Sequence, residues 1–148
     1  MVGSVGTQTH ISVIKDINRR GIPDLFVNSG YSGFYTDPKK YPTSFAGLGT
    51  YVVESKIEAD FLKKNYAAEL AAGKVGILYQ TDDFGRNVVE GFKKQGVTFP
   101  AANTQKFVAG SQSLGLTAQV QALQKAGVTL VVIGAVASAT AITIGTAA

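Results

Sequence analysis

Apolar residues recur along this chain at helical spacing, and most of these stretches end near a glycine that precedes a short apolar run. The first stretch predicts a helix over 7–20, because Ile11, Ile14 and Ile17 fall on one stripe and Thr7 can cap its start. Further helices are predicted over 50–65, from Thr81–Asp83 through Val88, Val89 and Phe92, and through Val120 and Leu123. Strands are predicted over 22–27, 74–79, 106–108 and 128–133, the last with the strongest signal of burial.

The helix predicted over 50–65 carries an apolar stripe of Val53, Ile57 and Phe61, and its charged residues lie outside that stripe. This amphipathic pattern is typical of a helix that buries its apolar face. We therefore expect these three side chains to lie against the core.

The order helix, glycine, strand, polar loop and helix is typical of a parallel sheet, because parallel neighbours need a helical crossover. The predicted fold class is α/β, with parallel sheets and flanking helices. One long connection, 35–49, lacks periodicity, and Asp37-Pro38 and Tyr41-Pro42 exclude a helix there. Long irregular connections often join lobes. We therefore expect two partial lobes, 1–46 and 47–148.

Composition and charge exclude several classes of protein. The chain has 148 residues, 45% hydrophobic and 16% charged, which excludes a disordered, collagen-like or coiled-coil chain. The net charge of +4 comes from lysines and arginines scattered in ones and twos, so no nucleic-acid partner is expected. With no cysteine and a single histidine, His10, we expect neither a metal site nor a thiol nucleophile.

The two ends of the sequence bear on localisation. Residues 1–4 have neither the basic start nor the apolar stretch of a signal peptide. Residues 128–148 carry no charge, but they are rich in Ala, Thr and Gly. This composition favours a buried strand followed by a small-residue helix, or a frayed end, over a membrane span.

Ligands of open α/β sheets bind at the carboxyl ends of the strands, where helix N-termini present free N–H groups. Gly3–Gln8 opens a helix without a nucleotide-binding motif, so its N–H groups are expected to face a carboxylate or water. Ser29 and Ser32 suit the carboxylate and ammonium groups of a zwitterion, or they cap their own loop. Phe84 either faces the cleft or joins the core.

No catalytic residue and no cofactor is predicted. A serine nucleophile in the loop 28–33 would need a base, and the single candidate, His10, is expected on a helix surface. Asp82 and Asp83 are expected to cap a helix, and the Asp-Phe-Gly sequence that follows Asp82 stands without any other kinase element.

A series of segments carries a more specific signal, namely 2–7, 21–30, 37–42 and 73–85. In order and spacing they resemble type I periplasmic solute-binding proteins of the branched-chain amino acid ABC-transporter class. The resemblance covers essentially the whole chain, although the chain looks like only the middle of such a protein. It implies two Rossmann-like lobes that close on a small carboxylate-bearing solute, such as an amino acid or an aromatic acid. It also implies a periplasmic or extracytoplasmic protein that serves a membrane permease.

The resemblance implies which residues contact the solute, namely Gly6, Thr7, Ser29, Gly30, Tyr31, Phe84 and Val136. In the family an aromatic side chain covers the bound ligand, and the resemblance places Phe84 at that position, where relatives often carry Tyr. It places Val136 at the position of a second aromatic contact. Asp24 looks like an insertion relative to the family. The resemblance also places the hinge, where the chain crosses from one lobe to the other, near residues 45–51.

Two other interpretations stay open. A small flavodoxin-like domain would use the same helix starts to bind a phosphorylated ligand. Alternatively, the chain only assembles, because partial lobes leave apolar faces uncovered, and we then expect a homodimer or segment exchange.

Overall fold

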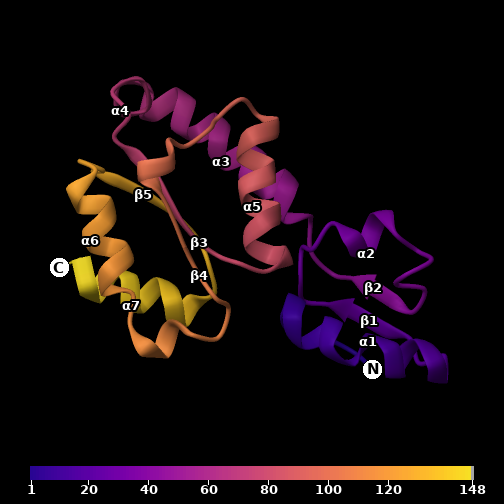
Figure 1. Ribbon diagram of the computed structural model, residues 1–148. Helices are drawn as coiled ribbons and strands as arrows, with labels where there is room; N and C mark the ends of the chain where they lie inside the picture. Colours follow the sequence, from indigo (N-terminus) through magenta and orange to yellow (C-terminus); the bar gives the residue numbers. More distant parts are fainter. Residues whose placement is uncertain (148) are drawn as a thin grey trace.

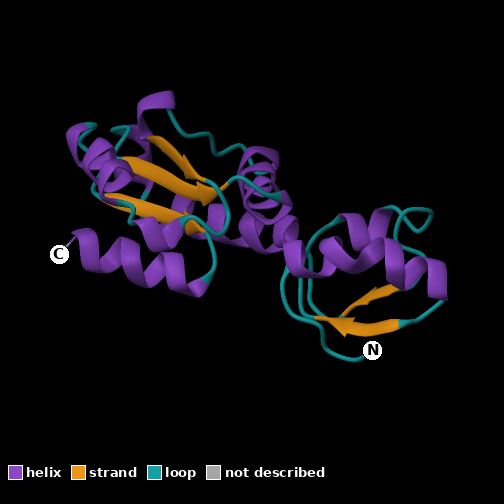
Figure 2. Cartoon of the chain, turned by 60° about the horizontal axis from the view of Figure 1, so that its bottom comes forward, coloured by secondary structure: helices purple, strands orange, loops and turns teal. Residues whose placement is uncertain are grey.

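The protein is described by a computed structural model over residues 1–147, in which the strands form two separate sheets (Figures 1 and 2). Every pairing between these strands is parallel. Helices flank both sheets, so the predicted α/β class is confirmed.

The elements follow one another in the alternating order that the sequence predicts. The helices are α1 (Thr7–Arg20), α2 (Gly33–Thr36), α3 (Tyr51–Asn65), α4 (Ala67–Ala71), α5 (Asp83–Lys94), α6 (Thr117–Lys125) and α7 (Ala137–Ala147), with 3-10 turns η1 (Ala101–Asn103) and η2 (Gln112–Leu114). The strands are β1 (Asp24–Val27), β2 (Ser44–Ala46), β3 (Val75–Gln80), β4 (Thr104–Phe107) and β5 (Leu130–Gly134).

The first sheet pairs β1 with β2, and single bridges attach the segment 2–5 to the other edge of β1. Its core is small and contains Ile14 of α1, Val27 of β1 and Phe34 of α2. Figure 1 shows this amino-terminal group of elements apart from the second sheet, with α3 leading from one to the other.

Strand β1 contains a bulge. Leu25 pairs with Phe45 and Val27 pairs with Ala46, which leaves Phe26 without a partner. The φ angle of Phe26 is 59°, in the left-handed region that residues other than glycine rarely adopt. The sequence places an inserted residue at Asp24, whereas the unpaired residue of this strand is Phe26.

The second sheet has the order β4-β3-β5, so β3 is its central strand. Successive side chains of a strand point to opposite faces. Ile77 packs in one core with Phe92 of α5, and Leu78 packs in another with Leu123 of α6. Figure 1 shows α3 and α5 on one face of this sheet and α6 and α7 on the other.

Helix α3 has the predicted bounds, but it buries a different face. Val53, Ile57 and Phe61 are 54%, 66% and 56% exposed, while the buried residues of α3 are Ser55, Ala59 and Leu62. The reason is the close approach of α3 to α5. A Cβ atom at Gly91 of α5 would lie 2.6 Å from the Ser55 Cβ and 2.6 Å from the Val52 carbonyl oxygen, so there is no room for a side chain at Gly91.

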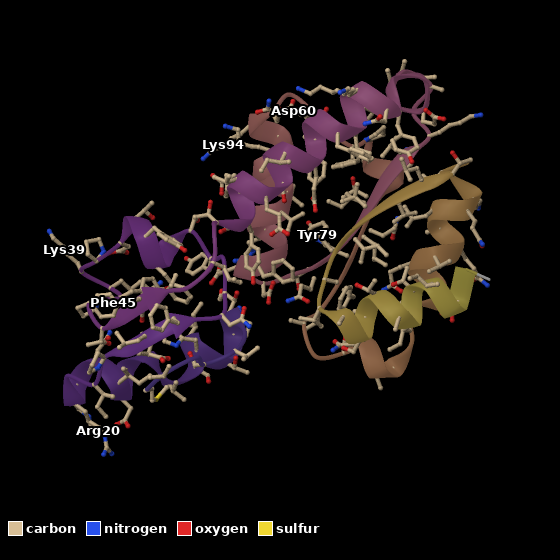
Figure 3. All side chains as sticks on the ribbon, turned by 180° about the vertical axis from the view of Figure 1, so that it is seen from behind. Arg20, Lys39, Phe45, Asp60, Tyr79 and Lys94 are labelled. Atoms are coloured by element: carbon tan, nitrogen blue, oxygen red, sulfur yellow. The ribbon has the colours of Figure 1, made fainter. Side chains whose placement is uncertain are left out.

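Hydrogen bonds between polar groups also connect the ends of α3 and α5. The Gln95 side chain donates to the Asp60 carboxylate at 2.8 Å, and the Lys63 ammonium donates to the Gln95 carbonyl at 3.0 Å. Figure 3 shows Asp60 and Lys94 at the same end of the two packed helices. The pair α3–α5 is therefore held by small residues in its middle and by hydrogen bonds at this end.

Two further sequence predictions need correction. The stretch 35–49 contains β2, whose three residues are too few to give a visible period-2 pattern. β5 was expected to be strongly buried, but four of its five residues are only half-buried, because it is an edge strand.

The predicted small-residue helix is α7, and no helix among residues 1–147 has the length and apolar content to cross a membrane.

Candidate functional site

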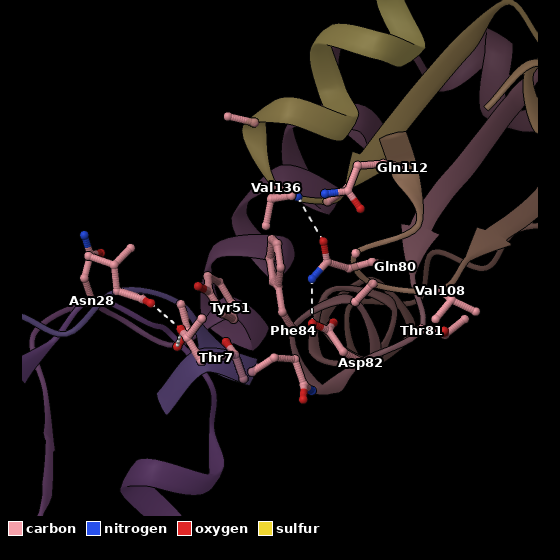
Figure 4. A pocket seen from close by; sticks show the side chains of 18 residues that line it. Thr7, Asn28, Tyr51, Gln80, Thr81, Asp82, Phe84, Val108, Gln112 and Val136 are labelled. Atoms are coloured by element: carbon pink, nitrogen blue, oxygen red, sulfur yellow. Dashed lines mark hydrogen bonds between the residues drawn. The ribbon is translucent and has the colours of Figure 1, made fainter. Parts of the chain in front are cut away.

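A pocket of about 830 Å³ lies between the two groups of elements, where parallel strands end and helices begin (Figure 4). Its lining comes from the start of α1, the ends of β1 and β3, the start of α3 and the loops that follow β4 and β5. The residues are Val5, Gly6, Thr7, Gln8, Thr9, Asn28, Tyr51, Gln80, Thr81, Asp82, Phe84, Val108, Ala109, Gly110, Gln112, Ala135, Val136 and Ala137.

The first wall of the pocket is the N-terminus of α1. Gly6 is the N-cap residue, with a φ angle of 94°, and no side chain caps the first turn. The first N–H groups of an α-helix have no partner within the helix, and the helix dipole adds positive potential there. This wall therefore offers hydrogen-bond donors and favours an anionic group.

Thr7 starts α1 as predicted, but it is not the cap. Its Oγ1 lies 2.7 Å from the Ser29 Oγ, and both side chains are buried. The backbone N–H of Tyr31 also donates to the Ser29 hydroxyl, at 3.2 Å. Ser29 thus stands behind Thr7 and fixes the direction of its hydroxyl, while Thr7 itself lines the pocket.

Gly30 and Tyr31, for which the resemblance implies contact with the solute, are not among the residues that line this pocket. The Gly30 carbonyl accepts the backbone N–H of Tyr51 at 2.8 Å, and a Cβ at Gly30 would lie 2.5 Å from the Gly49 carbonyl oxygen. The ring of Tyr31 packs edge-on against Phe34, in the first core. Burial is the main cause that raises the pKa of Tyr31 to about 12. In this structure both residues contact neighbouring segments of the chain, and their contact with a solute stays a prediction.

The opposite wall is aromatic. Phe84, in the first turn of α5, faces the ring of Tyr51 at a centroid distance of 4.3 Å with a 40° tilt. Phe84 also packs against the core that contains Ile77 and Phe92. This residue therefore both lines the pocket and joins a core. Val136 lines the pocket from the loop after β5.

Gln80, the last residue of β3, joins three parts of this second wall. Its Nε2 donates to Asp82 Oδ2 at 2.5 Å, and its Oε1 accepts the Val136 N–H at 3.1 Å, as Figure 4 shows. Asp82 is the predicted cap of α5, and its Oδ1 accepts the Gly85 N–H at 3.0 Å. Gln80 therefore fixes the loop of Val136 relative to the helix that carries Phe84.

Two residues of the lining, Tyr51 and Gln80, were not expected there from the sequence. The rule that ligands meet the carboxyl ends of strands selects Asn28, which follows β1, and it could also have found Gln80, the last residue of β3. Tyr51 gave no such signal, since it comes from the start of α3, after a long connection.

The two walls are joined near the pocket by polar contacts between distant segments. Asn87 of α5 is buried, and its Oδ1 accepts the Ser32 N–H at 2.8 Å. Together with the bond between Gly30 and Tyr51, this contact places the loop after β1 against the starts of α3 and α5.

The lining contains one charged side chain, Asp82, and both of its carboxylate oxygens already accept hydrogen bonds. Among residues 1–147 no group of three or more His, Asp or Glu side chains is placed to hold a metal ion. The pocket therefore has backbone donors and the Thr7 hydroxyl on one wall, and on the other an aromatic and apolar surface beside the polar side chains of Gln80, Thr81 and Asp82.

His10 does not lie on the helix surface as expected; it is buried behind the first wall. The spacing of the buried residues of α1 explains the error, because Thr7, His10, Ile14 and Ile17 are separated by three or four positions and share one face. The buried face of α1 thus begins with two polar side chains and ends with two apolar ones.

Comparison of the sequence with protein-family models and with curated proteins gave no match. Comparison of the fold with solved structures found similarity to a possible leucine/isoleucine/valine-binding protein from Rhodopirellula baltica SH 1. The two chains are 18% identical, with a TM-score of 0.70 over 99% of this chain. The alignment covers 39% of that longer chain, so the present sequence spans less than half of its length. At this identity the similarity concerns the fold.

Proposed function

We propose that this chain is part of a solute-binding protein, of the type I periplasmic class, that binds a small carboxylate-bearing solute such as an amino acid. The observation that carries the proposal is the pocket itself. It brings the uncapped start of α1 and the Thr7 hydroxyl opposite Phe84 and Val136. A donor-rich wall that faces Phe84 and Val136 suits a ligand with a carboxylate at one end and an apolar side chain at the other.

In this proposal the backbone N–H groups at the start of α1 and the Thr7 hydroxyl hold the carboxylate, and Ser29 orients that hydroxyl from behind. Phe84 and Val136 contact the apolar part of the solute. Each charge-assisted hydrogen bond contributes about 1.5–3 kcal/mol to binding, so Thr7 is the side chain whose loss should cost most affinity.

The division of the chain into partial lobes, 1–46 and 47–148, belongs to the same proposal. The two separate sheets support it, and so does the course of the chain from β2 into α3 at the predicted hinge. Binding would bring the two lobes together on the solute, and the closed form would present a surface to a membrane permease outside the cytoplasm. The fold similarity to a possible leucine/isoleucine/valine-binding protein is consistent with this role.

Isothermal titration calorimetry with L-leucine, L-isoleucine and L-valine tests the proposal, with inorganic phosphate and flavin mononucleotide as ligands for the flavodoxin-like alternative. We expect saturable binding of at least one amino acid and none of the phosphorylated compounds. The reverse pattern, or heat from neither class, contradicts the proposal.

A matched pair of variants locates the binding site. Thr7→Val keeps the shape of the side chain but removes the hydroxyl, and it should weaken binding roughly 10-fold or more, the equivalent of one charge-assisted hydrogen bond. Thr36→Val removes an exposed hydroxyl outside the pocket lining and should bind like the unmodified chain. Equal affinities for the two variants would place the solute elsewhere.

A homodimer is a second proposal, which specific exposed surfaces favour. Val53, Ile57 and Phe61 form an uncovered row on α3, and β5 is an edge strand without charged residues. Such edges and apolar rows promote association between copies. Light scattering over a range of protein concentrations should show a dimer that Ile57→Ser weakens, whereas a monomer at every concentration contradicts it.

A further inference from the structure

A chain of hydrogen bonds centred on His10 joins the elements behind the first wall of the pocket. His10 Nδ1 lies 3.0 Å from Asp24 Oδ2 of β1, and His10 Nε2 lies 2.7 Å from Ser44 Oγ of β2. The Ser4 hydroxyl donates to the same Asp24 oxygen and lies 3.2 Å from His10 Nδ1. His10 and Asp24 are 1% and 0% exposed. One imidazole therefore connects α1 with three neighbouring segments.

The partners of His10 determine where its proton lies. The Asp24 carboxylate can only accept, so the proton of a neutral imidazole belongs on Nδ1 and points at Asp24 Oδ2. His10 Nε2 is then an acceptor, and the Ser44 hydroxyl donates to it. This arrangement satisfies both ring nitrogens without a second proton.

The surroundings of His10 oppose a second proton. Burial is the largest influence and lowers the pKa of His10, while the Asp24 carboxylate acts in the opposite direction with smaller effect. The other contacts of the ring are neutral: Ser4, Ser44 and the ring of Phe34, which packs edge-on at 5.0 Å. Near Asp24, the Met1 amino group donates to the Pro23 carbonyl at 2.7 Å.

Backbone hydrogen bonds connect this cluster to the pocket. The Asn28 N–H donates to the Ser4 carbonyl at 2.7 Å, and the Gly6 N–H donates to the Asn28 carbonyl at 3.2 Å. The His10 N–H donates to the Gly6 carbonyl at 3.2 Å, which closes the first turn of α1. Gly6 and Asn28 both line the pocket, so Ser4 and His10 are each linked to the pocket wall by one or two hydrogen bonds.

We propose that His10 is a positioning residue for the anion-binding start of α1 and that its protonation in mildly acidic solution weakens solute binding. The inference rests on the proposed function for its effect on affinity, but the coupling between His10 and the start of α1 stands on the contacts above. It makes the first wall of the pocket sensitive to pH although no histidine touches the solute.

The mechanism is a change of donor and acceptor roles. A second proton on Nε2 turns this atom into a donor, so the Ser44 hydroxyl must rotate to accept and loses its own acceptor. The added charge lies in a buried site where hydration cannot stabilise it. Relief requires movement of α1 away from β2, and such movement displaces the N–H groups of its first turn.

The experiment follows His10 by NMR, because it is the one histidine of the chain and its ring signals need no assignment by mutation. The ring and the backbone amides of Gly6, Thr7 and Gln8 are followed from about pH 7.5 to about pH 5, and L-leucine affinity is measured over the same range. We expect a neutral Nδ1–H tautomer, a midpoint below 6.5 and amide shifts with that midpoint. Affinity should fall at least about fivefold on acidification.

Three variants separate positioning from general stability. In His10→Gln the amide shifts and the loss of affinity with that midpoint should disappear. Ser44→Ala removes the hydrogen-bond partner of His10 Nε2 in both protonation states and should shift the midpoint, even if His10→Gln does not fold. Ser55→Ala, a buried serine in α3, is the control and should leave the midpoint unchanged.

The outcomes distinguish this inference from the proposed function. If the amides of Gly6, Thr7 and Gln8 do not follow the ring, or Ser44→Ala leaves the midpoint unchanged, the coupling is wrong. An identical pH profile of leucine affinity in His10→Gln overturns it as well. If leucine does not bind at any pH while the amides still follow the ring, the proposed function fails and the coupling is upheld.

Discussion

The exposure of the two phenylalanines Phe61 and Phe92 gives a direct test of how α3 and α5 pack. Phe92 is completely buried in the core beneath α5, with its ring 5.4 Å from that of Phe99. Replacing a buried Phe by Ala removes its burial and leaves a cavity, at a cost of about 3–5 kcal/mol. Phe61 is more than half exposed and forms no part of the buried core, so Phe61→Ala should cost less than about 1 kcal/mol.

Urea denaturation followed by circular dichroism measures both effects as changes in the free energy of unfolding. The measurement is made at low protein concentration, because association through the exposed row on α3 would otherwise add to the apparent stability of the unmodified chain. Phe61→Ala thereby serves as the matched control for Phe92→Ala, with the same atoms removed from the neighbouring helix.

Equal destabilisation by Phe61→Ala and Phe92→Ala would contradict this packing of α3 against α5. That result would mean that α3 buries the stripe of Val53, Ile57 and Phe61, as the amphipathic pattern alone predicts. A difference of about 2 kcal/mol or more between the two variants agrees with the packing described here.

Other predictions concern single contacts. Asp82→Ala removes the cap of α5 and a partner of Gln80, so it should lower the free energy of unfolding by about 1–2 kcal/mol in urea denaturation, whereas the same change at Asp83 should cost less. Gly91→Ala should destabilise by about 1–3 kcal/mol through contact with Ser55, and a neutral result would contradict the close helix approach. Because burial lowers the pKa of His10 in the folded chain, the unfolded chain takes up a proton first as the pH falls below 6.5. The free energy of unfolding should therefore fall with acidification, and it should fall less in His10→Gln.

Much of the fold was predictable because local signals agreed with the tertiary structure. The bounds of α1 follow from its isoleucine spacing and from Gly21, whose φ of 62° permits the left-handed turn that ends the helix. Thr50 accepts the Val53 N–H at 3.2 Å and explains where α3 begins. In both cases the determining interactions lie within a few residues of each other.

The errors arise where a distant partner decides the outcome. Which face of α3 is buried depends on Gly91, far along the chain, since a residue without a side chain lets the small residues of α3 approach. His10 is buried because Asp24 and Ser44 come from two other strands to receive it. No pattern within α1 or α3 contains that information.

In the candidate site, too, local signals placed some residues correctly, while long-range contacts determine the position of others. Gly6, Thr7, Phe84 and Val136 come together in the pocket because the rule for strand ends operates within each αβ unit. Gly30 and Tyr31 fall outside its lining because the loop after β1 turns toward Tyr51 and the first core, which depends on long-range contacts.

An NMR titration of the labelled chain with L-leucine tests the proposed solute site, because every backbone amide reports where the ligand lies. We expect saturable shifts at the start of α1, with matching shifts at Phe84 and Val136 on the opposite wall. Shifts confined to one wall or to another surface, or a spectrum that leucine leaves unchanged, would contradict it.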